Sequence, residues 1–237
     1  MSELQTKSDR RVLVISDTHA PFSHPDTVPF LAHLKKKLKP HVVVHIGDVV
    51  DFHAMSNYEY DPNGYSPGHE LGKAIEFLQE IYELFPKVLV CFGNHDIRIA
   101  SKAFGAGIPR QAIRDISEII GCPKGWSCSD SWDIDGVRYE HGNGLSGKDA
   151  AIKAATSNFC PTVIGHVHTA ASVHWLANRT ALIWAMNTGC LIDNKSYVFK
   201  YGSDHRNKPI ISCGVVDCGR PSVMPMLLDS NGRWVGE

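Results

Sequence analysis

The chain has 237 residues and a formal net charge of −1, from 24 Lys and Arg against 25 Asp and Glu. That balance gives no overall attraction to polyanions or anionic lipid, so a nucleic-acid substrate would need a local basic patch. Hydrophobic residues make up 43% of the chain, and no run approaches the roughly 18 apolar residues of a membrane span, which excludes disorder and insertion into a membrane. We therefore expect a single domain over residues 1–237 with its own core.

The cysteines and the first residues bear on the cellular compartment. Seven cysteines, an odd number without a Cys-x-x-Cys pair, predict reduced thiols. Segment 1–11 is polar and only four apolar residues follow it, a pattern that lacks the apolar region of a secretory signal. We expect a cytoplasmic protein.

The first half of the chain alternates short β-branched runs with helical patterns. Strands are predicted at 11–15, 42–46 and 88–92, and helices at 27–38, 71–84 and 111–120. This order predicts a parallel sheet covered by helices. Each predicted strand ends in a polar cluster, and the carboxyl ends of neighbouring strands are where open α/β sheets bind ligands.

The second half predicts antiparallel pairing. A hairpin is expected over 132–140 with Asp135-Gly136 as its turn, and a second hairpin pairs 172–177 with 181–186. The other predicted features are a helix at 149–156 and loops at 52–69 and 193–209. An antiparallel-rich sheet is thus expected to follow the parallel one.

Residue types that bind metals recur in five short blocks, each after a predicted strand. The two-residue spacing of Asp17 and His19 turns both side chains to the same side. Several later blocks carry Gly where the backbone must approach a site closely. In chain order the blocks are Asp17-x-His19, Gly47-Asp48-x-x-Asp51, Gly93-Asn94-His95-Asp96, His141-Gly142 and Gly165-His166-x-His168. Each block alone is weak evidence, but all five in this order are specific.

These five blocks resemble those of the calcineurin-like metallophosphoesterase superfamily. They span residues 17–168. Beyond them, residues 187–191 and the tail more loosely resemble a phage and prokaryotic branch, which implies the bacterial cytoplasm or a phage-infected host as the location. The resemblance implies an α/β fold, a four-layer α/β/β/α sandwich with two mixed β-sheets and the metals at one edge.

The resemblance also implies two divalent metal ions. Asp17, His19, Asp48 and His168 would hold the first, and Asp48, Asn94, His141 and His166 the second, so that Asp48 bridges them. Oxygen and imidazole donors without a thiolate favour Mn, with Fe, Zn or Ni as alternatives. A hydroxide shared by the ions would attack phosphorus in line, without a covalent phosphoenzyme.

Three further residues have expected roles at the substrate. His95 would be the general acid for the leaving oxygen, and Asp51 would orient it and raise its pKa, with a helix N-cap as the alternative for Asp51. Arg98 is a candidate phosphate donor beside Asn94 and His95, although an exposed Arg at a helix start is the more ordinary interpretation. The remaining histidines are assigned no role: His24, His33, His41, His45, His53, His69, His174 and His205.

A competing motif lies at 142–148, which has the GxxxxGK spacing of a P-loop between a predicted strand and a predicted helix. Asp149 stands where a P-loop needs a hydroxyl for Mg, and an acid there would repel nucleotide phosphates. We expect its glycines to let the backbone pass close to the metals instead.

The predicted function is a dinuclear metal-dependent phosphoesterase acting on a phosphate ester, with a nucleotide or small diester favoured. The near-neutral charge weighs against a non-specific nuclease. GNHD, without an Arg beside the GDxxD block, weighs against a phosphoprotein phosphatase. A nuclease using a local patch, a phosphomonoesterase and a non-catalytic scaffold on the same fold stay open. The basic residues that could form such a patch are Lys35 to Lys39, Arg179, Lys195, Lys200, Arg206 and Lys208.

The loop at 52–69 carries Tyr58, Tyr60 and Tyr65 and is expected to determine what reaches the metals. The tyrosines either pack the loop onto the domain, which we favour, or stack on a nucleobase.

Overall fold

Four parallel strands form the first sheet, and two antiparallel strands extend it at one edge. The computed structural model describes residues 9–56, 63–196 and 208–236, and within them the strand order is β11-β10-β1-β2-β3-β4. The strands are β1 (Arg11–Ile15), β2 (Val42–His45), β3 (Val88–Cys91), β4 (Trp126–Ser129), β10 (Ser212–Asp217) and β11 (Arg220–Pro225). Val12 pairs with Val42 and Val44 with Leu89, so the carboxyl ends of β1, β2 and β3 meet at one edge.

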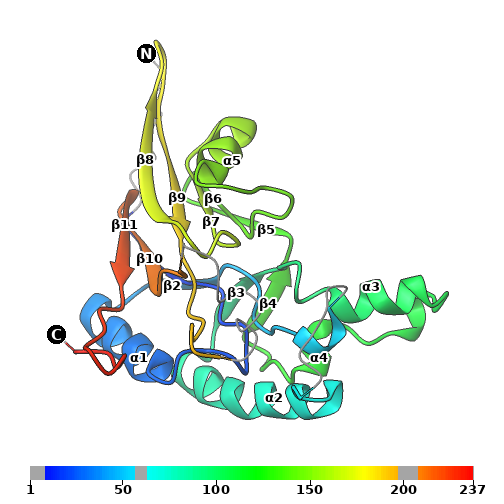
Figure 1. Cartoon of the computed structure of the whole chain (residues 1–237). Helices are drawn as coiled ribbons and strands as arrows, with labels where there is room; N and C mark the ends of the chain where they lie inside the picture. The colour runs from blue at the N-terminus through cyan, green and yellow to red at the C-terminus, as the bar shows by residue number, and fades with distance from the viewer. Residues whose placement is uncertain (1–8, 57–62, 197–207, 237) are drawn as a thin grey trace.

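The second sheet is also mixed, with the order β5-β6-β7-β9-β8 in the described residues. Its strands are β5 (Ser131–Ile134), β6 (Val137–Glu140), β7 (Thr162–Ile164), β8 (Ala171–Ala177) and β9 (Leu182–Thr188). β6, β7 and β9 are parallel, whereas β5 and β8 join their neighbours as antiparallel hairpins. The β5–β6 turn places Asp135 and Gly136 at φ values of 51° and 75°, which this two-residue turn requires. The β8–β9 hairpin extends away from the body of the molecule (Figure 1).

Helices cover the outer faces of the two sheets (Figure 1). They are α1 (Thr27–Leu38), α2 (Pro67–Leu84), α3 (Arg98–Gly105), α4 (Ile116–Ile119) and α5 (Ala150–Asn158), with 3₁₀ turns η1 (His53–Met55) and η2 (Arg110–Ala112). α2 begins four residues earlier than predicted because Pro67 occupies its first turn and Ser66 Oγ accepts a hydrogen bond from the His69 amide. No helix in the described ranges combines the length and hydropathy that crossing a bilayer requires.

Three buried clusters separate four layers. Leu13 of β1 shares a cluster with Leu31 of α1, on the helical side of the first sheet. The next residue, Val14, points the other way and shares a cluster with Tyr139 of β6, between the sheets. The alanines of α5 pack with Ile164 of β7 on the far face of the second sheet. The predicted α/β/β/α sandwich with two mixed sheets is therefore confirmed.

The predicted helix at 111–120 is wrong. The segment forms η2, an extended Ile113 and the short α4. The side chain of Arg110 donates to the Ile113 carbonyl at 2.9 Å and to the Asp115 carboxylate, which occupies a carbonyl that a continuous helix would use. α3 was not predicted; it is a short helix, and none of its residues is fully buried.

The other boundaries agree with prediction to within a few residues. β1 and α1 match their predicted ranges, and α5 begins one residue later and ends two residues later than predicted. Parts of both predicted loops, residues 57–62 and 197–207, lie outside the described residues. The predictions made for Tyr58, Tyr60, Lys200, His205 and Arg206 concern residues in these two segments.

Candidate metal centre

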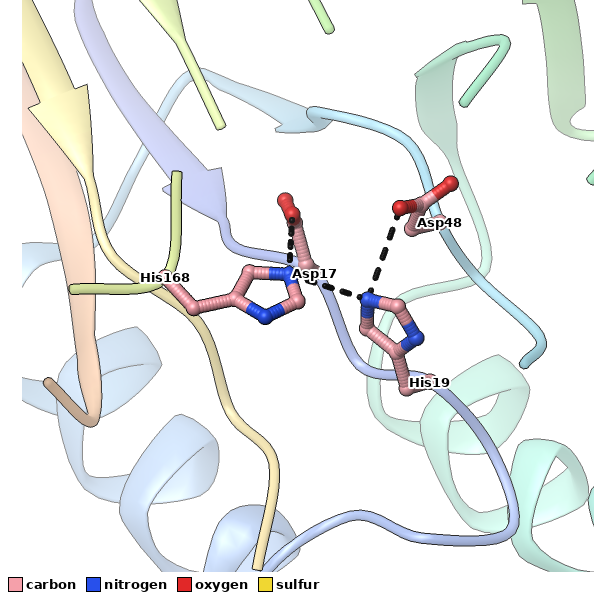
Figure 2. Close-up of side chains that lie close together, drawn as sticks. All are labelled: Asp17, His19, Asp48 and His168. Carbon is pink, nitrogen blue, oxygen red and sulfur yellow. Dashed lines mark hydrogen bonds and ion pairs between the residues drawn. The ribbon is translucent and has the colours of Figure 1, made fainter. Parts of the chain in front are cut away.

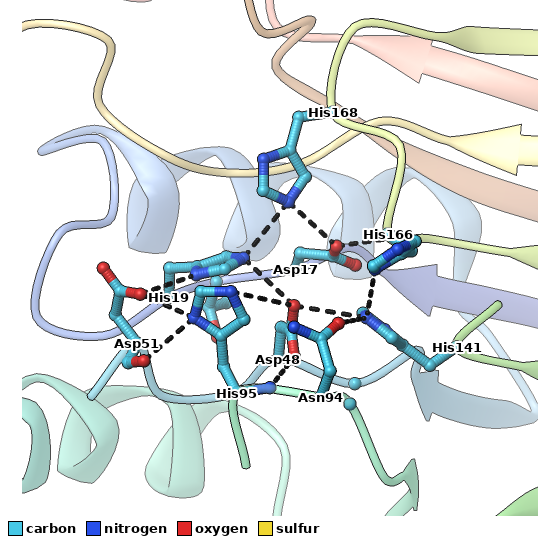
Figure 3. A network of polar contacts seen from close by, with 12 residues as sticks. Asp17, His19, Asp48, Asp51, Asn94, His95, His141, His166 and His168 are labelled. Carbon is cyan, nitrogen blue, oxygen red and sulfur yellow. Dashed lines mark hydrogen bonds and ion pairs between the residues drawn. The ribbon is translucent and has the colours of Figure 1, made fainter. Parts of the chain in front are cut away.

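The seven predicted ligands converge at the carboxyl ends of strands from both sheets (Figure 3). Asp17 and His19 follow β1, Asp48 follows β2, Asn94 follows β3, His141 follows β6, and His166 and His168 follow β7. Their ligand atoms form one group of Asp17, His19, Asp48 and His168 and a second group of Asp48, His141 and His166, each within 4.8 Å. Asp48 belongs to both groups.

Four side chains of the first group point toward one another (Figure 2). His19 Nε2 lies 3.4 Å from Asp48 Oδ2, and His168 Nε2 lies 3.3 Å from Asp17 Oδ2. The two imidazole Nε2 atoms are 3.2 Å apart. Asp17, His19 and Asp48 are buried, whereas the His168 side chain is 22% exposed, so this group meets solvent at His168.

The second group is centred on His141. Its Nε2 lies 3.2 Å from Asp48 Oδ2, 3.2 Å from Asn94 Oδ1 and 3.2 Å from His166 Nδ1. Its other ring nitrogen, Nδ1, donates to the Ile46 carbonyl at 3.1 Å. That bond leaves Nε2 as the ring nitrogen that faces the group, as a metal ligand requires.

These residues fit divalent metal ions. Asp17 Oδ1 is buried and has no hydrogen-bond partner in the described structure, although Asp17 Oδ2 accepts from the His166 amide at 2.8 Å. A buried carboxylate oxygen without a donor is costly unless a cation satisfies it. A Cβ on Gly165 would lie 2.1 Å from Asp17 Oδ1, and one on Gly93 would lie 2.1 Å from Asp48 Oδ1, so both glycines make room for the carboxylates.

The carboxylates create a strongly negative interior. Burial alone would raise the pKa of Asp17 and Asp48, but the surrounding histidines lower it, so both stay ionised. Burial alone would lower the pKa of His141, but Asp48 and Asp17 outweigh that effect and raise it to about 10. The site therefore attracts positive charge, whether as a proton or as a metal ion.

Three of the ligands adopt a backbone conformation that non-glycine residues rarely adopt. His19, Asp48 and His166 have φ values of 46°, 48° and 63°. Each such residue costs about 1–3 kcal/mol and persists only where its surroundings enforce it. Strain of this kind gathers at functional sites, and no local feature of the sequence indicates it.

His95 and Asp51 form a pair beside the first group. His95 Nδ1 lies 2.6 Å from Asp51 Oδ1, which is also 3.4 Å from His19 Nδ1. The alternative of Asp51 as a helix cap is not seen, because Phe52 precedes η1 and no side chain caps that turn. The His95 amide donates to Asp48 Oδ1 at 2.8 Å, which ties this pair to the shared carboxylate.

Arg98 is not the exposed helix-start residue that was the more ordinary interpretation. It does begin α3, but its side chain is 19% exposed and turned inward. Nη1 donates to the Asp51 and Phe52 carbonyls at 2.8 and 3.2 Å, and Nη2 donates to His95 Nε2 at 3.0 Å. Arg98 therefore holds the His95 and Asp51 pair.

Two buried acids near the site were missed from sequence. Asp96 Oδ1 accepts from the Val49 amide at 2.9 Å and Oδ2 from the Gly93 amide at 2.9 Å, which joins the loops after β2 and β3. Burial, helped by Asp48, raises the pKa of Asp96 to about 7. Glu70 of α2 accepts from the amides of His53 and Ala54 at 2.6 and 2.8 Å. The last position of the GNHD block pointed to Asp96, whereas nothing in the sequence pointed to Glu70.

The glycines of the P-loop-like segment have different surroundings. A Cβ on Gly142 would lie 3.3 Å from Ile164 and 3.6 Å from His166 Cβ, whereas one on Gly144 or Gly147 would meet nothing within 4 Å. Of these three glycines, only Gly142 therefore lets the backbone run close to a predicted ligand, His166, as expected from the sequence.

Tyr65, the described member of the three loop tyrosines, lies at the surface, 37% exposed, against two neighbouring rings. Its ring stacks on His69, with centroids 4.6 Å apart, and on Phe22, at 6.1 Å. These contacts favour the packing interpretation over stacking on a nucleobase for this residue.

Comparisons with known proteins agree with this geometry. The family model for calcineurin-like phosphoesterases matches residues 10–184. Similar solved structures include a metallophosphoesterase from Sphaerobacter thermophilus, with 14% identity over 93% of this chain and 89% of that chain and a TM-score of 0.48. YfcE, a phosphoesterase from E. coli, has 16% identity over 87% of this chain and 88% of that chain and a TM-score of 0.44. Vacuolar protein sorting 29 from Cryptosporidium parvum has 15% identity over 91% of this chain and 96% of that chain and a TM-score of 0.42.

No curated protein sequence matches the chain. The structural likenesses are distant. The family match covers well over half of the chain, and it does not distinguish branches, so the phage and prokaryotic branch stays a prediction. The chain belongs to the calcineurin-like phosphoesterase family.

Proposed function

We propose that this protein hydrolyses phosphate esters with the help of two divalent metal ions, and that a nucleotide or another small phosphodiester is its substrate. The observation that carries this proposal is the shared position of Asp48, whose Oδ2 lies 3.4 Å from His19 Nε2 and 3.2 Å from His141 Nε2. A carboxylate between two sets of donors suits a pair of ions that act on one phosphate.

Each predicted ligand has a place in this proposal. Asp17, His19, Asp48 and His168 would hold one ion, and Asp48, Asn94, His141 and His166 the other. When bound, the ions would supply Lewis-acid polarisation of the phosphate and a more acidic water. Manganese is the proposed metal, because the donors are oxygen and imidazole nitrogen without a thiolate.

His95 is proposed as the general acid. Its Nδ1 is taken by Asp51, so Nε2 is the atom that would give a proton to the leaving oxygen. Asp51 would hold the ring and favour its protonated form. Burial alone would lower the pKa of His95, but Asp48 and Asp51 outweigh burial and raise it. In this structure Arg98 Nη2 donates to His95 Nε2, so a substrate oxygen would have to displace Arg98 from that nitrogen. The Arg98 guanidinium would then lie beside the substrate phosphate.

The favoured substrate class rests on the charge of the chain. The net charge of −1 argues against a surface built for many nucleic-acid phosphates. All seven cysteines are free thiols, which agrees with the proposed cytoplasmic location. A nuclease, a phosphomonoesterase and a non-catalytic scaffold are the outcomes that the following experiment separates.

Metal-stripped protein would be titrated with Mn²⁺ and assayed on p-nitrophenyl phosphate and on bis(p-nitrophenyl) phosphate. We expect hydrolysis only with metal and faster hydrolysis of the diester. His95→Ala should lower kcat by roughly 10²–10⁴. His174→Ala on β8, whose Nε2 bonds Ser172 at 3.0 Å, is the matched control and should keep full activity.

The other outcomes are distinct. A preference for the monoester would move the substrate class to phosphomonoesters. Cleavage of an oligonucleotide faster than either chromogenic ester would identify a nuclease. Metal binding without turnover above the protein-free rate would contradict the enzyme and leave the scaffold.

A further inference from the structure

The side chains of Thr18 and His45, which have no assigned role, form a buried chain of hydrogen bonds beside the predicted ligands. This chain, which links Gly47, His45, Thr18 and Val49, is called the relay below. His45 is the last residue of β2, Thr18 lies between Asp17 and His19, and both are 0% exposed. Thr18 Oγ1 lies 3.0 Å from His45 Nε2 and 2.8 Å from the carbonyl oxygen of Val49. The other ring nitrogen, His45 Nδ1, lies 3.3 Å from the amide nitrogen of Gly47.

The direction of each hydrogen bond follows from its partners. The Gly47 amide can only donate, so His45 Nδ1 accepts and Nε2 carries the ring proton. Nε2 then donates to Thr18 Oγ1, and the Thr18 hydroxyl gives its own proton to the Val49 carbonyl. A neutral ring is what burial favours here, since it lowers the pKa of His45 to about 4. The relay therefore runs in one direction, from Gly47 to Val49, and uses each group once.

The relay encloses Asp48. Gly47 precedes Asp48 and Val49 follows it. The relay therefore ends in hydrogen bonds to the Gly47 amide and the Val49 carbonyl, which lie on either side of Asp48 in the backbone. The same two loops are also joined along the backbone, because the His19 amide donates to the Asp48 carbonyl and the Ala20 amide to the Val49 carbonyl, both at 2.9 Å. His19 and Asp48 are the residues held at φ 46° and 48°. Such conformations persist only where their surroundings over-determine them.

We propose that Thr18 and His45 are positioning residues that hold His19 and Asp48 in the left-handed conformation that metal binding needs. The inference rests on the proposed function, since it concerns the same metal centre. The hydrogen bonds described for the two side chains go to each other and to the backbone, so both would act through the backbone that carries the predicted ligands.

The sharpest test replaces the Thr18 hydroxyl alone. Thr18→Val keeps the shape of the side chain and removes the relay, whereas Thr18→Ser keeps the hydroxyl. The measurement is calorimetric titration of metal-free protein with Mn²⁺, together with thermal unfolding of the metal-free protein. We expect Thr18→Val to bind Mn²⁺ roughly 10–100-fold more weakly than wild type, as when the supporting partners of metal ligands are removed, and Thr18→Ser to bind within about threefold.

His45 variants test the other half of the relay and remain informative if Thr18→Val folds poorly. His45→Gln offers an amide donor near the place of Nε2, whereas His45→Leu offers none, so the Gln variant should recover part of the Mn²⁺ affinity lost in the Leu variant. In the double variant with Thr18→Val and His45→Leu, the losses of affinity should not add, because both changes break one relay.

Mn²⁺ affinity in Thr18→Val equal to that of wild type would overturn the proposal. If the unfolding temperature of metal-free Thr18→Val were lower at the same time, the role of Thr18 would be purely structural. Failure of the proposed function looks different, because wild type would then bind no Mn²⁺ or would bind it without hydrolysing either ester. In the second case the Mn²⁺ affinities of Thr18→Val and wild type still test the positioning role.

Discussion

Arg98 donates a hydrogen bond from Nη2 to Nε2 of His95, 3.0 Å away. Because His95 Nδ1 is bonded to Asp51 at 2.6 Å, both nitrogens of the ring are occupied. The ring is thus held in one orientation before any substrate arrives. A lysine could not reproduce this arrangement, since one ammonium cannot serve the His95 ring and the Asp51 and Phe52 carbonyls as a planar fork does.

Arg98→Lys should therefore lower kcat on the better ester by roughly tenfold, through misplacement of His95, with a smaller change in KM. Steady-state kinetics measure both, with the exposed Arg114→Lys as the matched control. A rise in KM that exceeds the fall in kcat would contradict a positioning role and would identify Arg98 as a binder of the substrate phosphate.

Asp48→Asn should remove metal from both groups, because its carboxylate faces His19 of one and His141 of the other. His168→Ala should weaken only the first group. Metal content after gel filtration, with Mn²⁺ titration, should show close to no ion in Asp48→Asn and one tightly held ion in His168→Ala. Two tightly held ions in Asp48→Asn would show that this carboxylate is not shared.

Gly165→Ala should weaken Mn²⁺ binding and lower activity, since its Cβ would lie 2.1 Å from Asp17 Oδ1 and force that carboxylate to shift. Gly72→Ala within α2 is the matched control, as its Cβ would meet nothing within 4 Å. The control should stabilise the protein by about 0.5–1 kcal/mol, the helix preference of Ala over Gly. Thermal unfolding and Mn²⁺ titration of both variants check this, and equal Mn²⁺ affinity in the two would refute it.

Glu70 should make stability depend on pH between about 4.5 and 6. Burial raises the pKa of Glu70 from its ordinary 4.5 to about 6, so the folded protein keeps this proton to higher pH than the unfolded chain does. The stability that the group contributes is full below about 4.5 and is lost as the pH rises through about 6. The unfolding temperature of wild type relative to Glu70→Gln should thus be higher at pH 4.5 than at pH 7. The same difference at both values would show that the pKa of Glu70 is not raised.

The convergence of the predicted ligands could be inferred from sequence because metal-binding residue types stand directly after predicted strands. Asp17 and Asp48 each follow a short β-branched run, and parallel strands bring their carboxyl ends together. The four layers were implied by the family resemblance, because β1 is apolar at both Leu13 and Val14 and its sequence does not show which of the two faces the second sheet.

What could not be predicted depends on tertiary contacts. The left-handed backbone of His19 and Asp48 has no local signal, because neither residue is a glycine. The inward turn of Arg98 depends on carbonyls more than 40 residues away in sequence. Thr18 looked like a spacer between two ligands, and its hydroxyl has a role only once β2 lies alongside.

The predicted ligands come from both sheets, which would link metal uptake to folding. Asp17, His19, Asp48 and Asn94 follow strands of the first sheet, while His141, His166 and His168 follow strands of the second. Three of the seven donors are therefore absent until the sheets have docked, and metal that binds only the docked state would stabilise it by about 2.7 kcal/mol at a hundred times the dissociation constant. Removal of the metal with a chelator should therefore weaken the docking of one sheet on the other as well as stop hydrolysis.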